Sequence, residues 1–282
     1  MSLCLGARPA LPTPPPVDGA GRVRFNHVKC APSAALAPFV DHYWLTRWDR
    51  RGQPARTASS LLDPCVHLQV EDGRGEVMGV VRRTFRMSIN GVGCIIGVKF
   101  RPGGFYPFVQ RAVSSFTDRV IPVDEVFVPV DARDASWASE MWNAAVECSG
   151  DAAVHSEVIA THLDAFLGAR IPARDAAAEE AGALVALIAT SAALRKVSDL
   201  VEASGRSERT LDRLFARYVG VSPGWVIRRH RLQGAAARLT AYPPASVPDV
   251  AWELGYADQA HLIRDFRDTI GITPGAYTRA RP

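Results

Sequence analysis

The stretch "DVAWELGYADQAHLIRDFRDTIGITPGAY" at residues 249–277 decides the fold, because a related segment precedes it in the chain. "VSDLVEASG" (197–205) matches "VPDVAWELG" (247–255) at an offset of 50 residues, and one extra residue then makes the offset 51. The later pairs are Ser207 with Asp258, Leu211 with Leu262, Arg213 with Arg264, Phe215 with Phe266, Gly220 with Gly271, Pro223 with Pro274 and Arg228 with Arg279. The C-terminal region is therefore a duplicated unit of about 32 residues.

Each unit predicts a short helix, a glycine turn and a second helix. Ser207 and Asp258 are N-cap residues for the second helices, because their side chains accept from an otherwise unpaired backbone N–H. The apolar stripe of the first unit must be buried; it consists of Leu211, Leu214, Phe215 and Tyr218. Gly220 and Gly271 end these helices, and the Ser-Pro and Thr-Pro pairs that follow begin the next ones.

A helix–turn–helix of this size places its second helix in the major groove of DNA. Arginine and glutamine are the residue types that bond two atoms of one base edge, and both lie on the faces opposite the buried stripes. The segment 223–239 predicts a connecting helix of about 25 Å, which would hold the two reading helices close to one DNA turn apart. Residues 206–239 also hold eight arginines against two acidic residues, a pattern typical of DNA binding and of solvated helix surfaces alike.

The residues from about 180 to 280 resemble the DNA-binding domain of the AraC/XylS-type transcriptional regulators. The resemblance implies base contacts from early exposed positions of each recognition helix: Arg209, Asp212 and Arg213, then Gln259, Ala260, His261 and Arg264. Asp212 accepts from a cytosine amine or pairs with a neighbouring arginine, and Ala260 touches a thymine methyl or nothing. We expect phosphate contacts from Ser207, Arg217, Arg228 and Arg267. Aromatic residues of the domain are expected in its core: Trp225, Trp252 and Tyr256.

The N-terminal half predicts a β structure followed by helices. Short apolar runs at 65–70, 75–81 and 94–100 alternate with glycine turns, which favours a barrel or sandwich. From about residue 136 the spacing turns helical, and Val154, Val158, Ile159 and Leu163 form a stripe that is a dimer seam or a cover for the barrel. We therefore expect an α+β multidomain chain: a disordered lead-in (1–22), a β-barrel or sandwich-like module ending in helices (23–168), a linker (169–178), and an all-α domain of two helix–turn–helix units joined by a long helix (179–282).

The segment from about 25 to 130 resembles an N-terminal module of uncharacterised role on one branch of the same family, through "VDHYWLTRW", "LLDPCVHLQV", "GVKFRPGGFYPFV" and "SSFTDRVIPVDEVF". Family members generally carry an effector or dimerisation domain at this place. Candidate effector-binding residues are Trp44, Arg101 and Tyr106. For Trp44 and Tyr106 an ordinary core role is the favoured alternative, and for Arg101 it is a pair with Asp118 or the capping of carbonyls.

Composition excludes several classes of protein. No apolar run approaches the length of a membrane span, and the first residues predict no secretory signal. The five cysteines are scattered, which favours reduced thiols in the cytoplasm. We expect no catalytic activity, no cofactor and no metal; the alternative is a metal- or thiol-dependent sensor or enzyme built around Cys65 and His67. Double-stranded DNA is the expected partner, while RNA polymerase, a small-molecule effector and a second copy of the chain are candidates. A second alternative makes the two units a protein-interaction scaffold.

Overall fold

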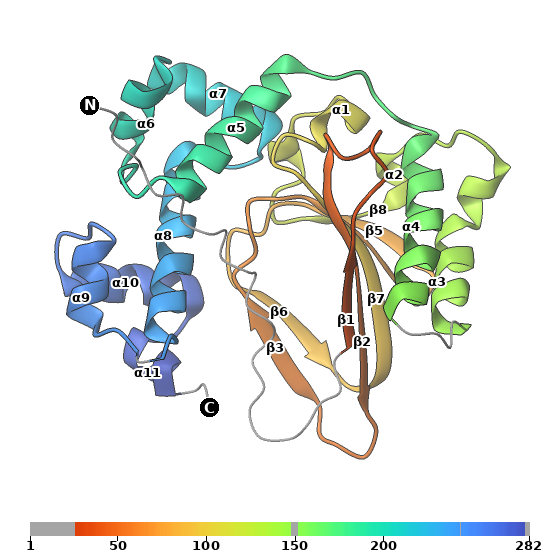
Figure 1. Cartoon of the computed structure of the whole chain (residues 1–282), viewed down its shortest axis with the longest axis horizontal. Helices are drawn as coiled ribbons and strands as arrows, with labels where there is room; N and C mark the ends of the chain where they lie inside the picture. The colour runs from red at the N-terminus through yellow and green to blue at the C-terminus, as the bar shows by residue number, and fades with distance from the viewer. Residues whose placement is uncertain (1–25, 148–151, 243, 280–282) are drawn as a thin grey trace.

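The computed structural model describes residues 26–147, 152–242 and 244–279 (Figure 1). The lead-in expected at 1–22 lies outside these described residues. A β-rich half comes first and a wholly helical half follows, as the sequence predicts. Within the described ranges, no helix is both long enough and apolar enough to cross a membrane.

The first half is built on an antiparallel six-stranded sheet with strand order β1-β2-β7-β4-β5-β8, accompanied by the two-stranded pair β3-β6. The strands are β1 Asn26–Cys30, β2 Val40–Arg50, β3 Arg56–Ser60, β4 His67–Glu71, β5 Arg74–Met78, β6 Phe85–Ile89, β7 Gly91–Phe100 and β8 Val120–Pro122. The long strands β2 and β7 pair along almost their whole length, from Val40 opposite Phe100 to Arg50 opposite Gly91. The sheet ends in β1 on one side and β8 on the other, so the β-rich module is open and the closed-barrel form of our expectation is wrong.

Alternation along β2 explains how the sheet is covered on both faces. Tyr43 and Leu45 are buried in the main core. Trp44 and Trp48 point to the opposite face, where Trp48 packs with Ile89 of β6. Gly97 lies beside Trp44, because a Cβ there would meet the indole ring at 2.4 Å. One face of β2 thus supports the helices that follow the sheet, and the other supports the β3-β6 pair.

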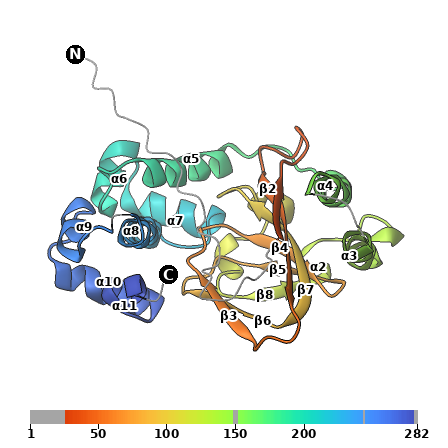
Figure 2. The ribbon, with the colours of Figure 1, turned by 60° about the horizontal axis from the view of Figure 1, so that its bottom comes forward.

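Helices α3 and α4 lie on one side of the sheet, and α5 to α11 lie on the other (Figure 2). The helical segments of the module are α1 Tyr106–Val109, η1 Val113–Ser115, α2 Val123–Val126, η2 Ala132–Ala135, α3 Trp137–Glu147 and α4 Ala152–Gly168. In α4, Ile159 and Leu163 are fully buried while Val154 is exposed. Asp164 accepts a hydrogen bond of 2.6 Å from the Tyr43 hydroxyl on β2. Ile159 and Leu163 therefore cover the chain's own sheet, whereas Val154 at the start of the stripe does not.

The second half contains the duplicated unit. Its helices are α5 Ala176–Thr190, α6 Val197–Ser204, α7 Glu208–Tyr218, α8 Pro223–Leu239, α9 Val247–Glu253, α10 Gln259–Ile270 and α11 Pro274–Arg279. Ser207 accepts from the backbone N–H of Thr210 at 3.3 Å, and Asp258 accepts from that of His261 at 2.7 Å. Gly220 and Gly271 have φ of +97° and +90°, a conformation that suits glycine. Two helix–turn–helix units joined by a long helix are confirmed.

The two units differ in how their cores are placed. Leu211 and Phe215 of α7 belong to the same hydrophobic core as the sheet, together with Val226 and Ile227 at the start of α8. Leu262 and Phe266 of α10 belong to a separate core that includes the second part of α8. The first unit is therefore continuous with the β-rich module, whereas the second has a core of its own.

One of the three aromatic residues expected in the core is not there. Tyr256 is buried and Trp225 is half-buried, but Trp252 is 82% exposed. Val250 and Ala251 of α9 and Leu254 directly after it are buried in the core of the second unit, and Trp252 projects outward. The sequence prediction for Trp252 is wrong, because apolar character alone does not fix the face of a helix of seven residues.

Candidate nucleic-acid interface

The outer face of α7 presents its polar side chains to solvent. Arg209, Asp212 and Arg213 are exposed, while Leu211 and Phe215 anchor the opposite face. Within the described part of the chain, neither arginine forms an ion pair, and Asp212 does not form the arginine pair that we considered. The guanidinium groups of Arg209 and Arg213 are therefore available to a partner outside the chain.

The outer face of α10 has the same arrangement with different side chains. Gln259, Ala260 and Arg264 are exposed, and Arg267 follows one turn after Arg264 on the exposed side. His261 is half-exposed, and its ring packs edge-on against Tyr256 with centroids 5.2 Å apart. This contact makes His261 part of the support of the turn as well as a candidate for base reading.

The connecting helix α8 holds the second unit through charged groups. Arg231 donates to the carbonyl oxygens of Leu254 and Gly255 at 3.0 and 3.1 Å, and its guanidinium lies over the Tyr256 ring at 3.9 Å. Arg238 pairs with Glu253 of α9 at 2.5 Å. These contacts fix the glycine turn relative to α8, and the turn sets the direction of α10.

Two residues predicted to contact phosphates are exposed, but each is already bonded to a partner within the chain. Arg217 donates through Nε to the Tyr106 hydroxyl at 2.9 Å, and its guanidinium lies 4.9 Å from the Tyr106 ring. Arg228 pairs with Asp265 of α10 at 3.0 Å and lies 4.0 Å from Asp268. Ser207 is exposed as the α7 cap, and Arg267 is exposed on α10, so these two remain open to a phosphate.

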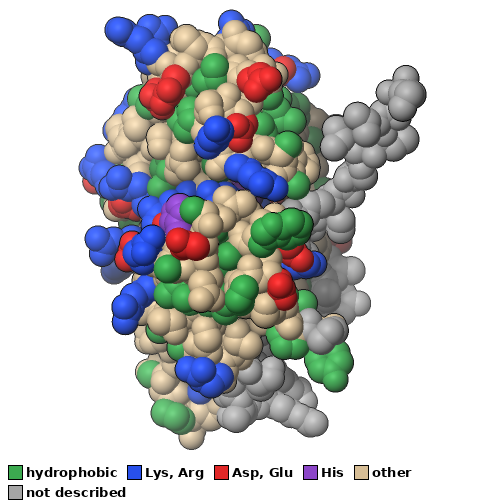
Figure 3. Space-filling view, turned by 90° about the vertical axis from the view of Figure 1, so that its left-hand side faces the viewer, with side chains coloured by type: hydrophobic (Ala, Val, Ile, Leu, Met, Phe, Trp, Pro, Cys, Tyr) green, Lys and Arg blue, Asp and Glu red, His purple; other side chains and the backbone are tan. Residues whose placement is uncertain are grey.

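Figure 3 shows basic side chains concentrated along the left edge of this face, with acidic side chains among them, and further basic side chains in its centre. A concentration of basic side chains along one edge is the electrostatic footprint expected for a polyanionic partner.

The β-rich module contacts the first helix–turn–helix unit through a hydrogen bond and close packing. The Thr117 hydroxyl donates to the carbonyl of Gly220 at 2.6 Å, and the rings of Tyr106 and Tyr218 are 4.5 Å apart. A Cβ on Gly220 would lie 2.9 Å from Val113 of η1. Helix α5 approaches just as closely, since a Cβ on Gly103 would lie 2.2 Å from the carbonyl oxygen of Ala178. The "RPGG" turn is thus a packing surface for α5.

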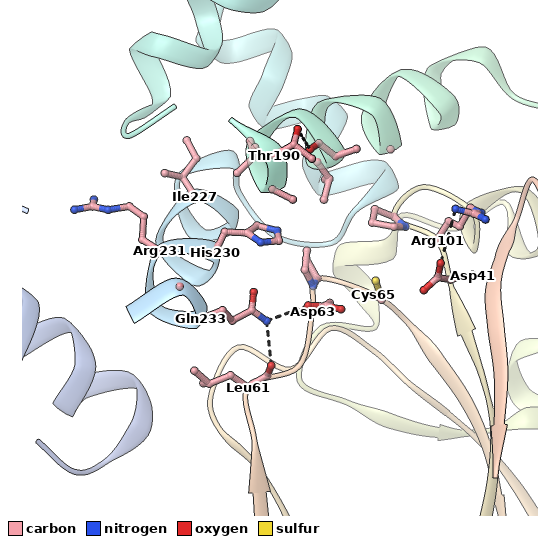
Figure 4. Close-up of a pocket in the computed structure, with 18 of the residues that line it drawn as sticks. Asp41, Leu61, Asp63, Cys65, Arg101, Thr190, Ile227, His230, Arg231 and Gln233 are labelled. Carbon is pink, nitrogen blue, oxygen red and sulfur yellow. Dashed lines mark hydrogen bonds and ion pairs between the residues drawn. The ribbon is translucent and has the colours of Figure 1, made fainter. Parts of the chain in front are cut away.

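A cleft of about 1010 Å³ opens between the module and the helices (Figure 4). Asp63, Cys65 and Arg101 line it from the module, and His230 and Gln233 line it from α8. Gln233 bridges the two sides by donating to the Leu61 carbonyl at 3.1 Å and to Asp63 at 3.0 Å. The cleft is therefore closed on one side by polar contacts between the two halves.

Lys99 forms close ion pairs with two carboxylates at the cleft. Lys99 donates to Asp63 at 2.5 Å and lies 3.4 Å from Asp41. Burial opposes the charge of Asp63, yet the Lys99 ammonium holds the pKa of that carboxyl below its usual value. Burial also lowers the pKa of His230, and its buried Nε2 atom has no hydrogen-bond partner among the described residues. The His230 imidazole is therefore neutral at pH 7, and the residue lines the cleft with one buried ring nitrogen that has no hydrogen-bond partner among the described residues.

The three predicted effector residues do not meet. Arg101 lines the cleft, where it donates to the Ala37 carbonyl at 2.8 Å and lies 3.8 Å from Asp41. Trp44 packs on Gly97 and His67 on the far face of β2, and Tyr106 holds Arg217. Asp118, considered as a partner of Arg101, instead pairs with Arg82 at 2.6 Å. The sequence analysis did not select Lys99, which lines the cleft. The signal that could have indicated it is a single lysine within the apolar run 94–100.

Cys65 and His67 are both buried. Burial raises the pKa of the Cys65 thiol to about 12 and lowers the pKa of His67 to about 4, so both are neutral at pH 7. Within the described residues no three His, Cys, Asp or Glu side chains are placed to hold a metal ion.

Two family profiles match separate parts of the chain. Residues 200–280 match a helix-turn-helix domain, and residues 28–122 match a domain of unknown function. An uncharacterised HTH-type transcriptional regulator of Haemophilus influenzae is 31% identical over 84 residues, which are 30% of this chain and 28% of that protein. The transcriptional activator NphR of Rhodococcus sp is 36% identical over 83 residues, 29% of this chain and 24% of that protein. The chain thus spans about a quarter of the length of these relatives.

Solved structures of regulators are also similar. A probable AraC family transcriptional regulator from Rhodopseudomonas palustris is 30% identical, with a TM-score of 0.31 over 35% of this chain and 94% of that one. ToxT from Vibrio cholerae bound to an unsaturated fatty acid is 10% identical, with a TM-score of 0.40 over 92% of each chain. The helix-turn-helix match, the duplicated unit and the regulator relatives agree with one another. Residues 200–280 of this chain therefore form an AraC-type helix-turn-helix domain, and it is joined to an N-terminal domain of unknown function at residues 28–122.

Proposed function

We propose that the chain is a sequence-specific DNA-binding transcription regulator that acts without catalysis. The observation that carries the proposal is the pair of capped helices, α7 and α10, whose polar faces are both exposed while their apolar faces are buried. The 17-residue helix α8 between them spans about 25 Å. Helices held in this way suit neighbouring major-groove segments of one duplex.

Base reading is assigned to the exposed early positions of the two helices. In α7 these are Arg209, Asp212 and Arg213; in α10 they are Gln259, Ala260, His261 and Arg264. Arginine bonds two acceptors of guanine and glutamine bonds adenine, whereas Ala260 offers only a methyl contact to thymine. Ser207 and Arg267 bind phosphates, and Arg217 and Arg228 join them when their internal partners release them.

A gel-shift measurement on the DNA upstream of the chain's own gene tests this function. The wild-type chain is expected to shift that DNA, and the double variant R213A/R264A is expected to lose the specific shift while retaining weak binding to random DNA. Equal loss on both kinds of DNA would contradict the assignment of these arginines to base reading, and no shift by the wild type would contradict the function itself.

The cleft between the two halves is our candidate effector site. It is the place where a small molecule would touch the module through Asp63 and Arg101 and the DNA-binding domain through His230. The unused Nε2 of His230 needs a polar partner, which a ligand would provide. A compound screen by thermal unfolding tests the site: a true effector stabilises the wild type and stabilises the variant H230A less. Equal stabilisation of the two proteins would remove the cleft from consideration.

A further inference from the structure

The module meets both reading helices at equivalent positions of the repeat. Arg209, Arg213 and Arg217 follow at every fourth residue on α7, and the last of them bonds Tyr106. Ala260, Arg264 and Asp268 occupy the corresponding positions of α10 at the offset of 51. Asp268 lines a small cavity with Arg82 and Arg83 of the module. Side chains four residues apart share one helix face, so the module lies at the C-terminal end of each reading face.

The charge at this place differs between the two units. The first unit carries Arg217 there, and the second carries Asp268 in the equivalent position. Arginines of the module stand beside Asp268, in the stretch "GVVRRTFRMSIN" (79–90), which has three arginines and no acidic residue. Arg82, Arg83 and Arg86 are all exposed. The module thus places positive charge beside the position at which the second unit carries Asp268 in place of an arginine.

The backbone of this stretch is held firmly against the DNA-binding domain. Arg229 of α8 is buried and donates to the carbonyls of Val81 and Arg82 at 3.0 and 2.6 Å. The Thr84 hydroxyl donates to the carbonyl of Thr269 on α10 at 2.7 Å. Burial lowers the pKa of the Arg229 guanidinium to about 10, which leaves it charged at pH 7. A fixed backbone with exposed arginines is suited to a rigid, negatively charged surface.

The same arginines also suit a structural role at the C-terminal end of α10. Arg86 Nη2 would lie 3.3 Å from a Cβ on Gly271, the residue that ends α10, and a cation there stabilises the helix dipole. Arg82 is already paired with Asp118 at 2.6 Å. A dipole role predicts an effect on stability alone, whereas a ligand role predicts an effect on binding, so the two are separable by experiment.

We propose that the segment Arg82–Arg86 of the N-terminal module is a third DNA contact, which binds backbone phosphates beside the second helix–turn–helix unit. The inference rests on the proposed function and extends it, because it makes the N-terminal module part of the DNA-binding surface. Asp268 lies one turn after Arg264 on α10 and lines one cavity with Arg82 and Arg83 of the module. DNA that lies along the exposed face of α10 would therefore come close to these arginines. They position the duplex without reading its sequence.

Salt-dependent DNA binding by the full chain tests the proposal. The variant R83Q/R86Q removes two exposed charges and leaves the Arg82–Asp118 pair in place. The control is R74Q, which neutralises an exposed arginine at the start of β5, outside the segment Arg82–Arg86. The probes are a duplex selected from a random pool and a random-sequence duplex. R83Q/R86Q is expected to bind both probes more weakly and to reduce the slope of log K against log salt by about 1 to 2.

A charge-restoring variant sharpens the test. D268R, added to R83Q/R86Q, puts a cation where the first unit has Arg217, and it is expected to recover part of the slope. Wild-type binding with an unchanged slope in R83Q/R86Q would overturn the third contact and leave the proposed function intact. A wild type that binds neither probe would overturn both. An unfolding midpoint that falls in R83Q/R86Q without any change in slope would assign the arginines to the helix dipole instead.

Discussion

The two helix–turn–helix units share a sequence pattern but differ in their attachment to the rest of the molecule. The first unit contributes Leu211 and Phe215 to the core of the β-rich module. Tyr106 of that module bonds Arg217 on the second helix of the unit, and Thr117 bonds Gly220 just after that helix. The second unit keeps a separate core around Leu262 and Phe266 and meets the module through polar contacts such as Thr84 with Thr269. A change in the module should therefore reach the first reading helix through packing and the second through hydrogen bonds.

The largest expected effect comes from emptying the two cores. Phe215 and Phe266 are equivalent and fully buried, and replacing either by alanine should cost about 3 to 5 kcal/mol of unfolding free energy. In F266A, hydrogen exchange should increase within residues 232–277 only. In F215A, it should also increase around Val113 and Phe116 of the module. Identical exchange maps for the two variants would remove the distinction between a shared and a separate core.

As the pH falls, the β-rich module should lose stability before the second helix–turn–helix unit does. Burial, followed by the nearby Lys99, lowers the pKa of His67 from 6.5 to about 4, so the unfolded chain binds a proton that the folded chain does not. Stability from this residue is therefore complete above pH 6.5 and is lost as pH falls toward 4, by about 2 kcal/mol at pH 5. Urea unfolding at pH 7 and pH 5 measures this, and H67Q should show a weaker pH dependence. A wild type and H67Q with the same dependence would refute the assignment.

Base reading should be comparable in the two units. R213A and R264A each should cost about 1 to 3 kcal/mol on the specific site and little on random DNA. Quantitative binding to a selected duplex and to a random duplex measures both effects. A cost confined to R213A would mean that α10 only clamps the duplex, and the comparison of the units would then extend from attachment to function.

The smallest expected effect concerns the contact that ties Arg217 to the module. Y106F removes the hydroxyl that Arg217 bonds, which should free the guanidinium for a phosphate and increase affinity for every sequence by about 1 kcal/mol or less. Y43F is the matched control, because its hydroxyl bonds Asp164 away from the reading helices. Weaker DNA binding by Y106F would mean that the contact orders α7 for binding.

Because of the repeat, the helices of the C-terminal half could be predicted from the sequence, together with the residues that cap them. Ser207, Asp258, Gly220 and the helix 223–239 are local features, each with a physical signature in the neighbouring residues. The module was predictable as short strands between glycine turns, but the open sheet was not, because closure depends on pairing between edges that are distant in the sequence.

The candidate site was predictable only where it follows the helix period. The exposed positions of α7 and α10 follow from the buried stripes, whereas the partners of Arg217 and Arg228 depend on how other segments pack against them. The cleft is lined by β7, α5 and α8, which no local pattern connects. Trp44, Arg101 and Tyr106 were chosen by residue type, and the fold places them in three different environments.

Selection of bound duplexes from a random pool by the full chain tests the central claim most directly. Two exposed reading helices joined by α8 predict two short motifs whose centres lie about one helical turn, or roughly 10 base pairs, apart. R213A should erase one motif and R264A the other. Enrichment of a single motif, or of none, would contradict the claim that α7 and α10 read one duplex together.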